Sequence, residues 1–528
     1  MTNISDNLPT DTTQPYRGDR PSADRGETEG REVKDFDDME RVIGEGLASA
    51  ARPNRFAQIV FLILVGLAAG LTIYLVVAPM SREATGAVVL LLTVLLLMCG
   101  VHVAPSMAVP GLLGIWKITG TAGVVSALET LPHHAVASWS LSVIPMFVLM
   151  GMLLFYSGVT VTLFEAARQW LGWVPGGLSV ATVGSGAGLA AASGSTLGIT
   201  FALGRIGIPE MLRAGYSPKL ATGTVAMSGT LKMLIPPSIT LVIYAGIATT
   251  PVGPQLLAGL VPGIILAGLF VATIVTWATI NPRIAPRVDT SGYTWGTRTR
   301  ALLQAWPLPL LTLIIVGGMY SGIATPTESG AIAALVTLVL AVWQGRREGV
   351  KEIVSRIGRA LSITVSSMAA IMLLIISVYI LNRAAALSAL PSQVTRLVTE
   401  WQLGKVEFLL ALVVLYVILG AFMDELAMML LTVPILLPVL NDLEIDLIWF
   451  GVFIALMCEI GMVVPPVGIM SFIVHGIAQD KEVNLGTTIK LTDVFLGVMW
   501  FVAISIVFVV VLIFYPEIAL WFPSLGSS

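Results

Sequence analysis

The amino-acid sequence predicts an all-α polytopic membrane protein, built from inverted repeats with two re-entrant helical hairpins and two broken helices. Composition is the first observation: 56% of the 528 residues are hydrophobic and 12% are charged, against about 25% in a typical soluble domain. The second is that apolar runs long enough to span a bilayer recur along the chain. The third is a Pro-Pro pair inside each of two apolar runs, Met233–Ala248 and Met462–Ala478, which both end in Gly-Ile-Ala.

The N-terminal segment differs from the rest of the chain. Residues 1–55 are polar and nearly free of aromatic side chains, so they cannot bury enough apolar surface to offset the entropy of folding. We expect a disordered cytoplasmic tail there. The first apolar run, 56–78, follows Arg52 and Arg55 and is too far from the start for a signal peptide, so it predicts an extra transmembrane helix.

Two kinds of apolar segment follow. Candidate spans lie near 84–104, 105–128, 140–160, 219–247, 253–280, 301–320, 327–344, 360–382, 446–478 and 491–514, and 219–247 and 446–478 are the two that carry the Pro-Pro pairs. Two further stretches, 176–205 and 403–440, are interrupted by the small or polar segments Ala190–Gly198 and Leu419–Met429. Polar groups at mid-membrane are costly, and irregular backbone is tolerated there only inside protein or along a wet cavity. Both stretches therefore predict re-entrant hairpins.

Loop charges predict the orientation in the membrane. Lys and Arg gather at 205–219, 283–300 and 346–359, which the positive-inside rule places in the cytoplasm. The segment Tyr320–Glu328 has no Lys or Arg and is expected outside. The N-terminus is then cytoplasmic and the C-terminus periplasmic. The basic residues between 383 and 405 also fall outside, where we expect an amphipathic surface segment.

The order of segments repeats. Residues 84–281 and 301–522 each give three spans, a hairpin, a broken span and one further span, and the two copies start on opposite sides. Proline breaks each second element because it lacks a donor and clashes with the preceding turn. Inverted repeats with paired broken helices indicate a secondary transporter with its site at mid-membrane. Freed carbonyls there suit a cation, and the N-termini of half-helices suit an anion.

Several long motifs resemble one family. They are "SGSTLG" (193–198), "GTLKMLIPPSI" (229–239), "ATPTESGAIAAL" (324–335), "GAFMDELAMMLLTVPILLPVL" (420–440) and "FGVFIALMCEIGMVVPPVGIMSFIVHGIA" (450–478). They resemble the large membrane subunit, the DctM-like type, of tripartite ATP-independent periplasmic (TRAP) transporters, over about residues 84–522. One departure is Val464, since members commonly have Thr before this Pro-Pro pair.

The resemblance implies an elevator-type importer in the bacterial inner membrane. It implies uptake of small organic anions, often carboxylates including dicarboxylates, that is driven by a sodium gradient with no other cofactor. The implied partners are a periplasmic substrate-binding protein and a four-helix small membrane subunit. Because only one extra span precedes residue 84, we expect the small subunit to be a separate chain.

The hairpin tips and broken helices supply the candidate site residues. The candidate sodium ligands offer hydroxyl, carboxylate or freed carbonyl oxygens and are Ser193, Gly194, Ser195, Gly229, Thr230, Gly420, Asp424, Gly461 and Val464. The candidate substrate contacts are Ser195, Lys232, Pro236, Pro237, Glu459, Pro465 and Pro466.

Each candidate has a structural alternative. The small residues could serve only close helix packing. Lys232 could extend to the cytoplasmic edge, Asp424 could cap a half-helix, and Glu459 could satisfy freed backbone donors. For Glu328 capping is the favoured role, because Thr325, Pro326 and Glu328 form a capping-box pattern. His475, alone near the end of a broken helix, is expected to pack rather than react.

Other protein classes lack their motifs here. The sequence contains no GxxxxGK[ST] phosphate loop, no HExxH zinc motif and no GxSxG elbow, so we expect a transporter and not an enzyme. Two alternatives stay open: a stand-alone sodium-coupled carboxylate transporter of a related elevator superfamily, and a non-transporting membrane receptor. Neighbouring genes for a binding protein and a four-span membrane protein would exclude the first.

Overall fold

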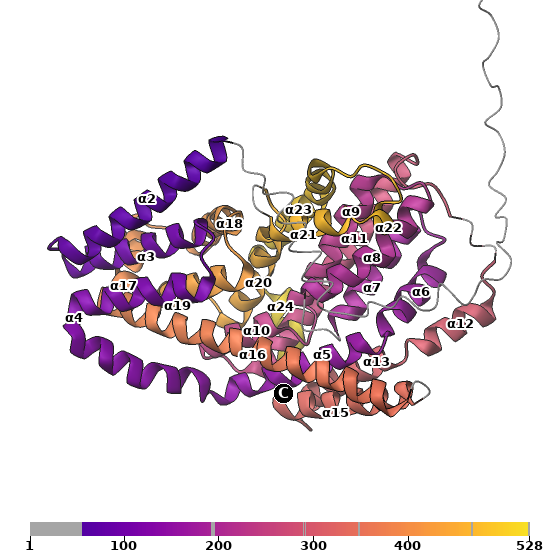
Figure 1. Ribbon diagram of the computed structural model, residues 1–528, viewed down its shortest axis with the longest axis horizontal. Coiled ribbons are helices and arrows are strands. Elements are labelled where there is room, and N and C mark those ends of the chain that lie inside the picture. Colours follow the sequence, from indigo (N-terminus) through magenta and orange to yellow (C-terminus); the bar gives the residue numbers. More distant parts are fainter. Residues whose placement is uncertain are drawn as a thin grey trace, which may run out of the picture.

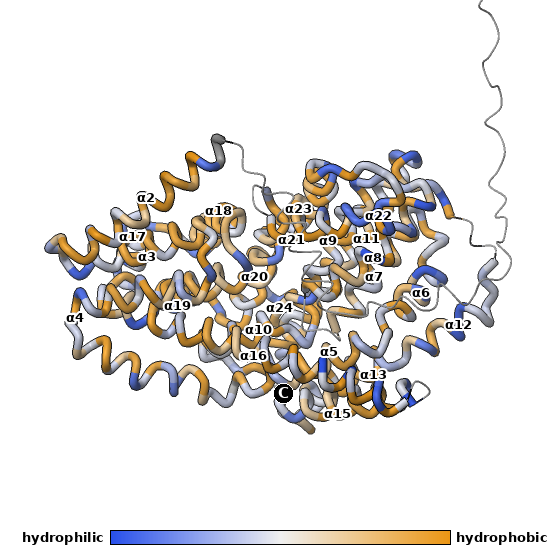
Figure 2. Tube along the Cα trace, viewed as in Figure 1, coloured by the Kyte–Doolittle hydropathy of each residue, from blue (hydrophilic) through white to orange (hydrophobic). Residues whose placement is uncertain are grey.

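The computed structural model describes residues 55–191, 196–288, 290, 292–346, 349–465 and 468–525. All regular structure within these ranges is helical. The predicted disordered tail lies outside them, except for Arg55, which opens the first described helix. Hydrophobic residues run along most helices, and hydrophilic segments occur mainly at helix ends and connections (Figure 2).

Seven helices are long and apolar enough to cross a membrane, or nine if two bent pairs each count as one span, among the described residues. The chain is therefore a multi-pass membrane protein, as its composition predicts. The seven are α2 (from Gln58 to Val77 by this test), α4 (Val103–Val136), α11 (Val252–Ile280), α15 (Pro326–Gly345), α16 (Val350–Leu387), α19 (Glu425–Asp442) and α23 (Leu491–Phe514).

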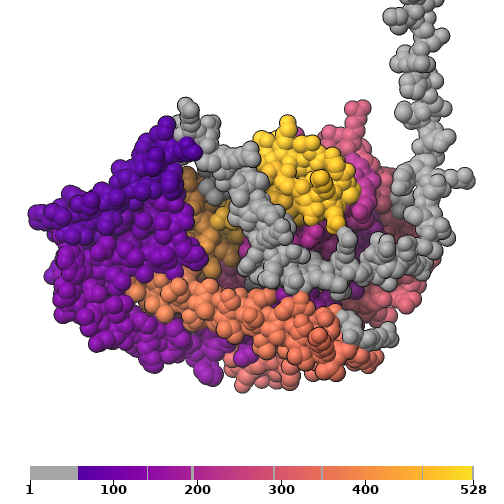
Figure 3. All heavy atoms as spheres, viewed as in Figure 1, coloured from indigo at the N-terminus to yellow at the C-terminus, as the bar shows by residue number. Residues whose placement is uncertain are grey.

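Long helices form an outer layer along one side of the molecule. Helix α2 (Arg55–Val77) packs on α3 (Arg82–Met98), α3 packs on α4, and α4 packs along α16 (Figure 1). Residues of α16 form a band across one face in the space-filling view (Figure 3). Gly120 has a φ of 74°, which bends α4, so the predicted span 105–128 is part of a longer kinked helix.

Two hairpins and two broken helices form the inner layer. The first hairpin pairs α7 (Gly177–Ala190) with α8 (Thr196–Arg213), and the second pairs α18 (Lys405–Gly420) with α19. The first broken helix consists of α9 (Pro218–Thr230), the 3-10 turn η2 (Leu231–Met233) and α10 (Ile239–Ala248). The second consists of α20 (Leu447–Gly461) and α21 (Ile469–Ile477).

Shorter helices make up most of the rest of the described structure. These other helices are η1 (Trp139–Ser142), α5 (Val143–Tyr156), α6 (Val159–Leu171), α12 (Trp295–Gln304), α13 (Pro307–Thr312), the π-helix η3 (Leu313–Gly317), α14 (Gly318–Tyr320), α17 (Leu390–Glu400), α22 (Lys481–Asn484) and α24 (Glu517–Leu525). Helices α5 and α6 meet at 72°, so the predicted span 140–160 stops at Tyr156 and a second helix leaves at a steep angle. Gly158 permits the turn with a φ of 70°.

Candidate functional site

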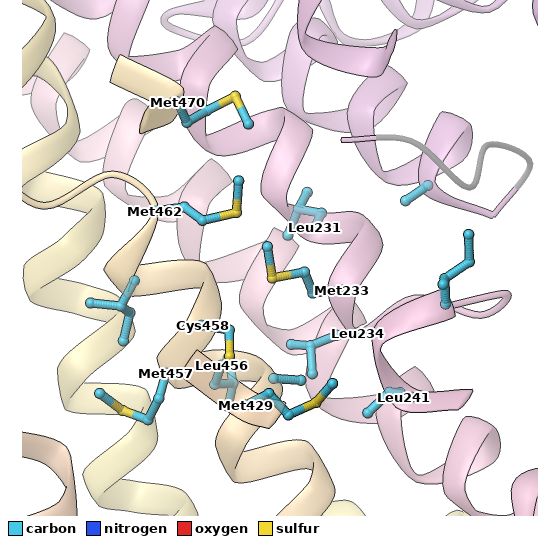
Figure 4. Packing of buried hydrophobic residues seen from close by; sticks show 14 of the residues in the cluster. Leu231, Met233, Leu234, Leu241, Met429, Leu456, Met457, Cys458, Met462 and Met470 are labelled. Carbon is cyan, nitrogen blue, oxygen red and sulfur yellow. The ribbon is translucent and has the colours of Figure 1, made fainter. Parts of the chain in front are cut away.

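The two helix breaks lie close together in the inner layer. Helix α10 packs on α19 and α20, and η2 packs on α20. Met233 and Leu234 from the first break, Met462 and Met470 from the second, and Met429 from the second hairpin lie in one apolar region (Figure 4). The elements that carry the predicted site residues therefore converge.

In the first break, hydrogen bonds of the Ser238 side chain stabilise the non-helical segment. Residues 234–238 leave the helix, and Pro236 and Pro237 are buried there. The Ser238 Oγ donates to the Met233 carbonyl at 2.6 Å and accepts the Leu241 N–H at 3.3 Å. Ser238 is thus the N-cap of α10, and the N-terminus of this half-helix begins inside the protein.

The second break also separates two half-helices, but a glycine, and not a serine, is the N-cap residue of its second half. Helix α20 ends at Gly461, and helix α21 begins after Gly468, its N-cap residue, which has a φ of 40°. The Ser471 Oγ donates to the Val463 carbonyl at 3.0 Å. Val464 is half-buried and Pro465 is exposed, whereas the predicted contact Pro466 lies outside the described residues.

Two predicted ligands meet at the second hairpin. A Cβ on Gly420 would overlap the backbone of Gly461, so only glycine allows the hairpin to approach α20 this closely. Asp424 follows the hairpin turn, and its Oδ1 accepts the Ala427 N–H at 2.6 Å. Asp424 therefore caps α19, the structural alternative that the sequence left open for it.

Buried threonine hydroxyls line the first half of the site. The Thr196 and Thr200 hydroxyls are buried and have no hydrogen-bond partner among the described residues. A Cβ on Gly229 would overlap the Thr200 Oγ1, so the broken helix lies directly against these groups. Neither threonine was among the predicted ligands, although Thr196 lies within the SGSTLG motif and both belong to α8, directly after the polar tip. The predicted ligands Ser193, Gly194 and Ser195 lie outside the described residues.

Two polar contacts join the halves. The Thr230 Oγ1 donates to Glu459 Oε1 at 2.7 Å, which connects the first broken helix to the second. The Lys232 Nζ lies 3.4 Å from Glu425 Oε1, which connects the first broken helix to the second hairpin. Lys232 is 4% exposed, and its ammonium faces the Glu425 carboxylate, whose side chain is 13% exposed, so it does not extend along the surface. Glu425 was not predicted, though it stands beside Asp424 in the hairpin tip.

Two further polar residues lie outside this cluster. Thr325 and Glu328 form a complete capping box at the start of α15, with the Glu328 Oε2 accepting the Thr325 N–H at 2.8 Å, which confirms the predicted capping role. His475 is in α21 and its Nδ1 lies 3.2 Å from the Gln479 Nε2.

A helical membrane protein whose paired hairpins and broken helices converge on buried oxygens belongs to the class of secondary transporters. Residues 89–518 match the family model described as tripartite ATP-independent periplasmic transporter, DctM component. The chain therefore belongs to the DctM family, the large permease component of TRAP transporters.

Similar proteins extend this result. The C4-dicarboxylate TRAP transporter large permease protein DctM of Vibrio cholerae is 30% identical, over 83% of this chain and 97% of its own length. The protein of the same name from Pseudomonas aeruginosa is 32% identical, over 76% of this chain and 90% of its own. Other relatives are named as isethionate, sialic acid and ectoine TRAP transporters.

Among solved structures, the fold resembles the Alcanivorax borkumensis YdaH transporter. The TM-score is 0.56 at 17% identity, over 83% of this chain and 99% of that chain. At this identity the likeness concerns the fold alone.

Proposed function

We propose that this chain is the permease of an importer that draws on a sodium gradient and receives small organic acids from a periplasmic binding protein. A separate four-helix membrane subunit completes the complex. Membership of a tripartite, ATP-independent family supports a requirement for partners and an ion gradient. That requirement also distinguishes the proposal from a stand-alone transporter, which would take up solute without a binding protein.

The orphaned threonine hydroxyls carry the sodium assignment. Buried polar groups normally have hydrogen-bond partners, and unpaired ones call for an unseen ion or water. Thr196 and Thr200 present neutral oxygens beside Gly229, at the base of the first hairpin tip. Hard cations prefer oxygen ligands, so the donor set fits sodium. With Ser193, Gly194, Ser195 and Thr230 it would form the first ion site, and Gly420, Asp424, Gly461 and the Val464 carbonyl would form a second.

The proposed movement is that of an elevator. Residues 84–281 and 301–522 form two inverted repeats, with the N-terminus in the cytoplasm and the C-terminus in the periplasm. The hairpins and broken helices form the moving part, and α3, α4 and α16 belong to the static part. The close packing of α4 along α16 and of α3 on α4 supports this division.

Replacing one orphaned hydroxyl tests the sodium assignment. Thr200→Val keeps the shape and removes an oxygen, so the sodium concentration for half-maximal uptake should rise at least fivefold. Uptake is measured in proteoliposomes that carry the small subunit and the loaded binding protein. Thr364→Val is the matched control, because the Thr364 hydroxyl donates within α16 to the Ala360 carbonyl. Equal sodium dependence in both variants, or equal uptake with potassium, would refute the assignment.

A further inference from the structure

The Lys232–Glu425 ion pair is a second polar feature of the site, beside the threonine hydroxyls. Lys232 belongs to η2, directly after α9, and Glu425 is the first residue of α19 after the hairpin turn. Their side chains are 5% and 13% exposed, and Nζ lies 3.4 Å from Oε1. This distance is long for a charge-assisted hydrogen bond, which is usually about 2.7–2.9 Å. The two charges are therefore close enough to attract each other but do not form a short hydrogen bond.

Charges around the site are unbalanced. Both hairpin tips and both breaks, spanning 189–200, 229–239, 419–429 and 457–471, contain one basic residue, Lys232, and three acidic ones, Asp424, Glu425 and Glu459. Asp424 is engaged as a helix cap, and the single ammonium is engaged by Glu425. Charged groups at membrane depth are costly unless they are paired.

Two carboxyl oxygens have unused acceptor capacity. Glu425 Oε2 and Glu459 Oε2 are buried and have no hydrogen-bond partner among the described residues. Glu459 is 0% exposed. Cys458, next to it, contacts the Glu425 carbonyl through Sγ at 3.4 Å, so both glutamates belong to one neighbourhood. Lys232 holds the charge of Glu425, and an ionised carboxylate only accepts hydrogen bonds, so a carboxylate-only solute supplies Glu425 with no donor.

Building on the proposed function, we propose that the transported solute is a zwitterion, with its carboxylate on Lys232 and its cationic nitrogen on Glu425 and Glu459. A simple anion that takes Lys232 would leave Glu425 as an unpaired buried charge, which is strongly unfavourable. A zwitterion instead inserts between the two side chains and replaces one ion pair with two. Its N–H groups also supply donors for the orphaned oxygens. A dicarboxylate adds two negative charges beside Glu425, where Lys232 is the one ammonium of the described site.

A matched solute panel tests the class. Butyrate, succinate and 4-aminobutyrate share a four-carbon chain and differ in charge, and proline and ectoine extend the zwitterions. Uptake is measured in proteoliposomes with both partner proteins under an inward sodium gradient. A zwitterion should enter at least tenfold faster than any anion of the panel. Preferential uptake of an anion would overturn the zwitterion assignment and leave the importer intact. No sodium-dependent uptake of any solute would count against both proposals.

Two variants separate recognition from folding. Glu425→Gln keeps the shape but removes the charge, so the preference for the zwitterion over succinate should fall at least tenfold. The double variant Lys232→Met/Glu425→Met replaces the pair with apolar side chains, which should preserve folding and abolish zwitterion uptake. Arg396→Gln/Glu400→Gln, which removes an exposed pair on α17, serves as the control and should transport normally. Normal uptake by the Met/Met variant would make the pair structural and refute the proposal.

Discussion

Glycine carries much of the site at the scale of single residues, because it lets backbones touch. Gly420 and Gly461 meet at the second hairpin, and Gly223 and Gly497 meet where α9 packs on α23. A side chain at any of these contacts would push apart elements that the site needs together.

Gly420→Ala should therefore destabilise the protein. The added Cβ would meet the Gly461 backbone, and overpacking of this kind costs about 1–3 kcal/mol. The apparent unfolding temperature of the purified protein should fall accordingly. Gly268→Ala in α11 is the control: its Cβ meets nothing within 4 Å, and alanine favours a helix by up to about 1 kcal/mol. If the two variants unfold at the same temperature, the close contact is not as tight as described.

The sequence predicted which polar residues belong to the site better than it predicted which of them contact each other. Asp424 and Glu459 stand out because carboxylates inside apolar runs are rare. Capping by Asp424 was one of the alternatives that the sequence left open, because its contact with Ala427 is local. The partner of Glu459 could not be derived, since Thr230 lies 229 positions away. Lys232 illustrates the same limit: the sequence gives a costly charge, and only tertiary packing selects Glu425 as its counter-ion.

At the scale of elements, the helix breaks at the two Pro-Pro pairs were predictable from the sequence, whereas the helix bend at a glycine was not. A proline inside a helix removes one backbone hydrogen bond and clashes with the preceding turn, and two in succession favour a break. A single proline does not suffice, since α19 continues through Pro434 and Pro438. The 72° bend after α5 depends on Gly158 in a left-handed conformation. Glycine adopts many conformations, so its presence in the sequence does not predict which one it takes. The predicted amphipathic segment near 383–405 contains α17, whose Leu390 is buried while Arg396 is exposed.

Capping of half-helix α10 gives a prediction at this scale. Ser238→Ala removes the acceptor for the Leu241 N–H, which should cost about 0.5–2 kcal/mol and slow uptake, because α10 begins at the site. Ser81→Ala removes the equivalent cap of α3, where Ser81 Oγ accepts the Ala84 N–H at 3.1 Å. That control should lose comparable stability and keep its uptake. Thermal unfolding and initial uptake rates measure the two effects; slowed uptake in both variants would contradict a special role for α10.

For the molecule as a whole, the packing assigns some helices to the inner layer. Helix α23 packs closely on α9 and also contacts α20 and α21, and α11 packs on α7, α10 and α20. Both long spans therefore belong with the hairpins and broken helices, whereas hydropathy alone makes them look like outer spans. An apolar helix can be buried either in lipid or inside the protein, so its hydrophobicity does not tell whether it belongs to the outer or the inner layer.

Membrane orientation is the prediction for the whole chain. By the positive-inside rule, Arg283, Arg287, Arg298 and Arg300 predict that the loop after α11 is cytoplasmic, and the expected alternation of spans then predicts a periplasmic C-terminus. An alkaline phosphatase fused after Ser528 should be active, because the enzyme folds only outside the cytoplasm, and green fluorescent protein at the same position should stay dark. Fluorescent protein inserted in the 283–300 loop is the control and should fluoresce. A fluorescent C-terminal fusion with an inactive phosphatase would put both ends of the second repeat on one side, and the inverted-repeat arrangement could not stand.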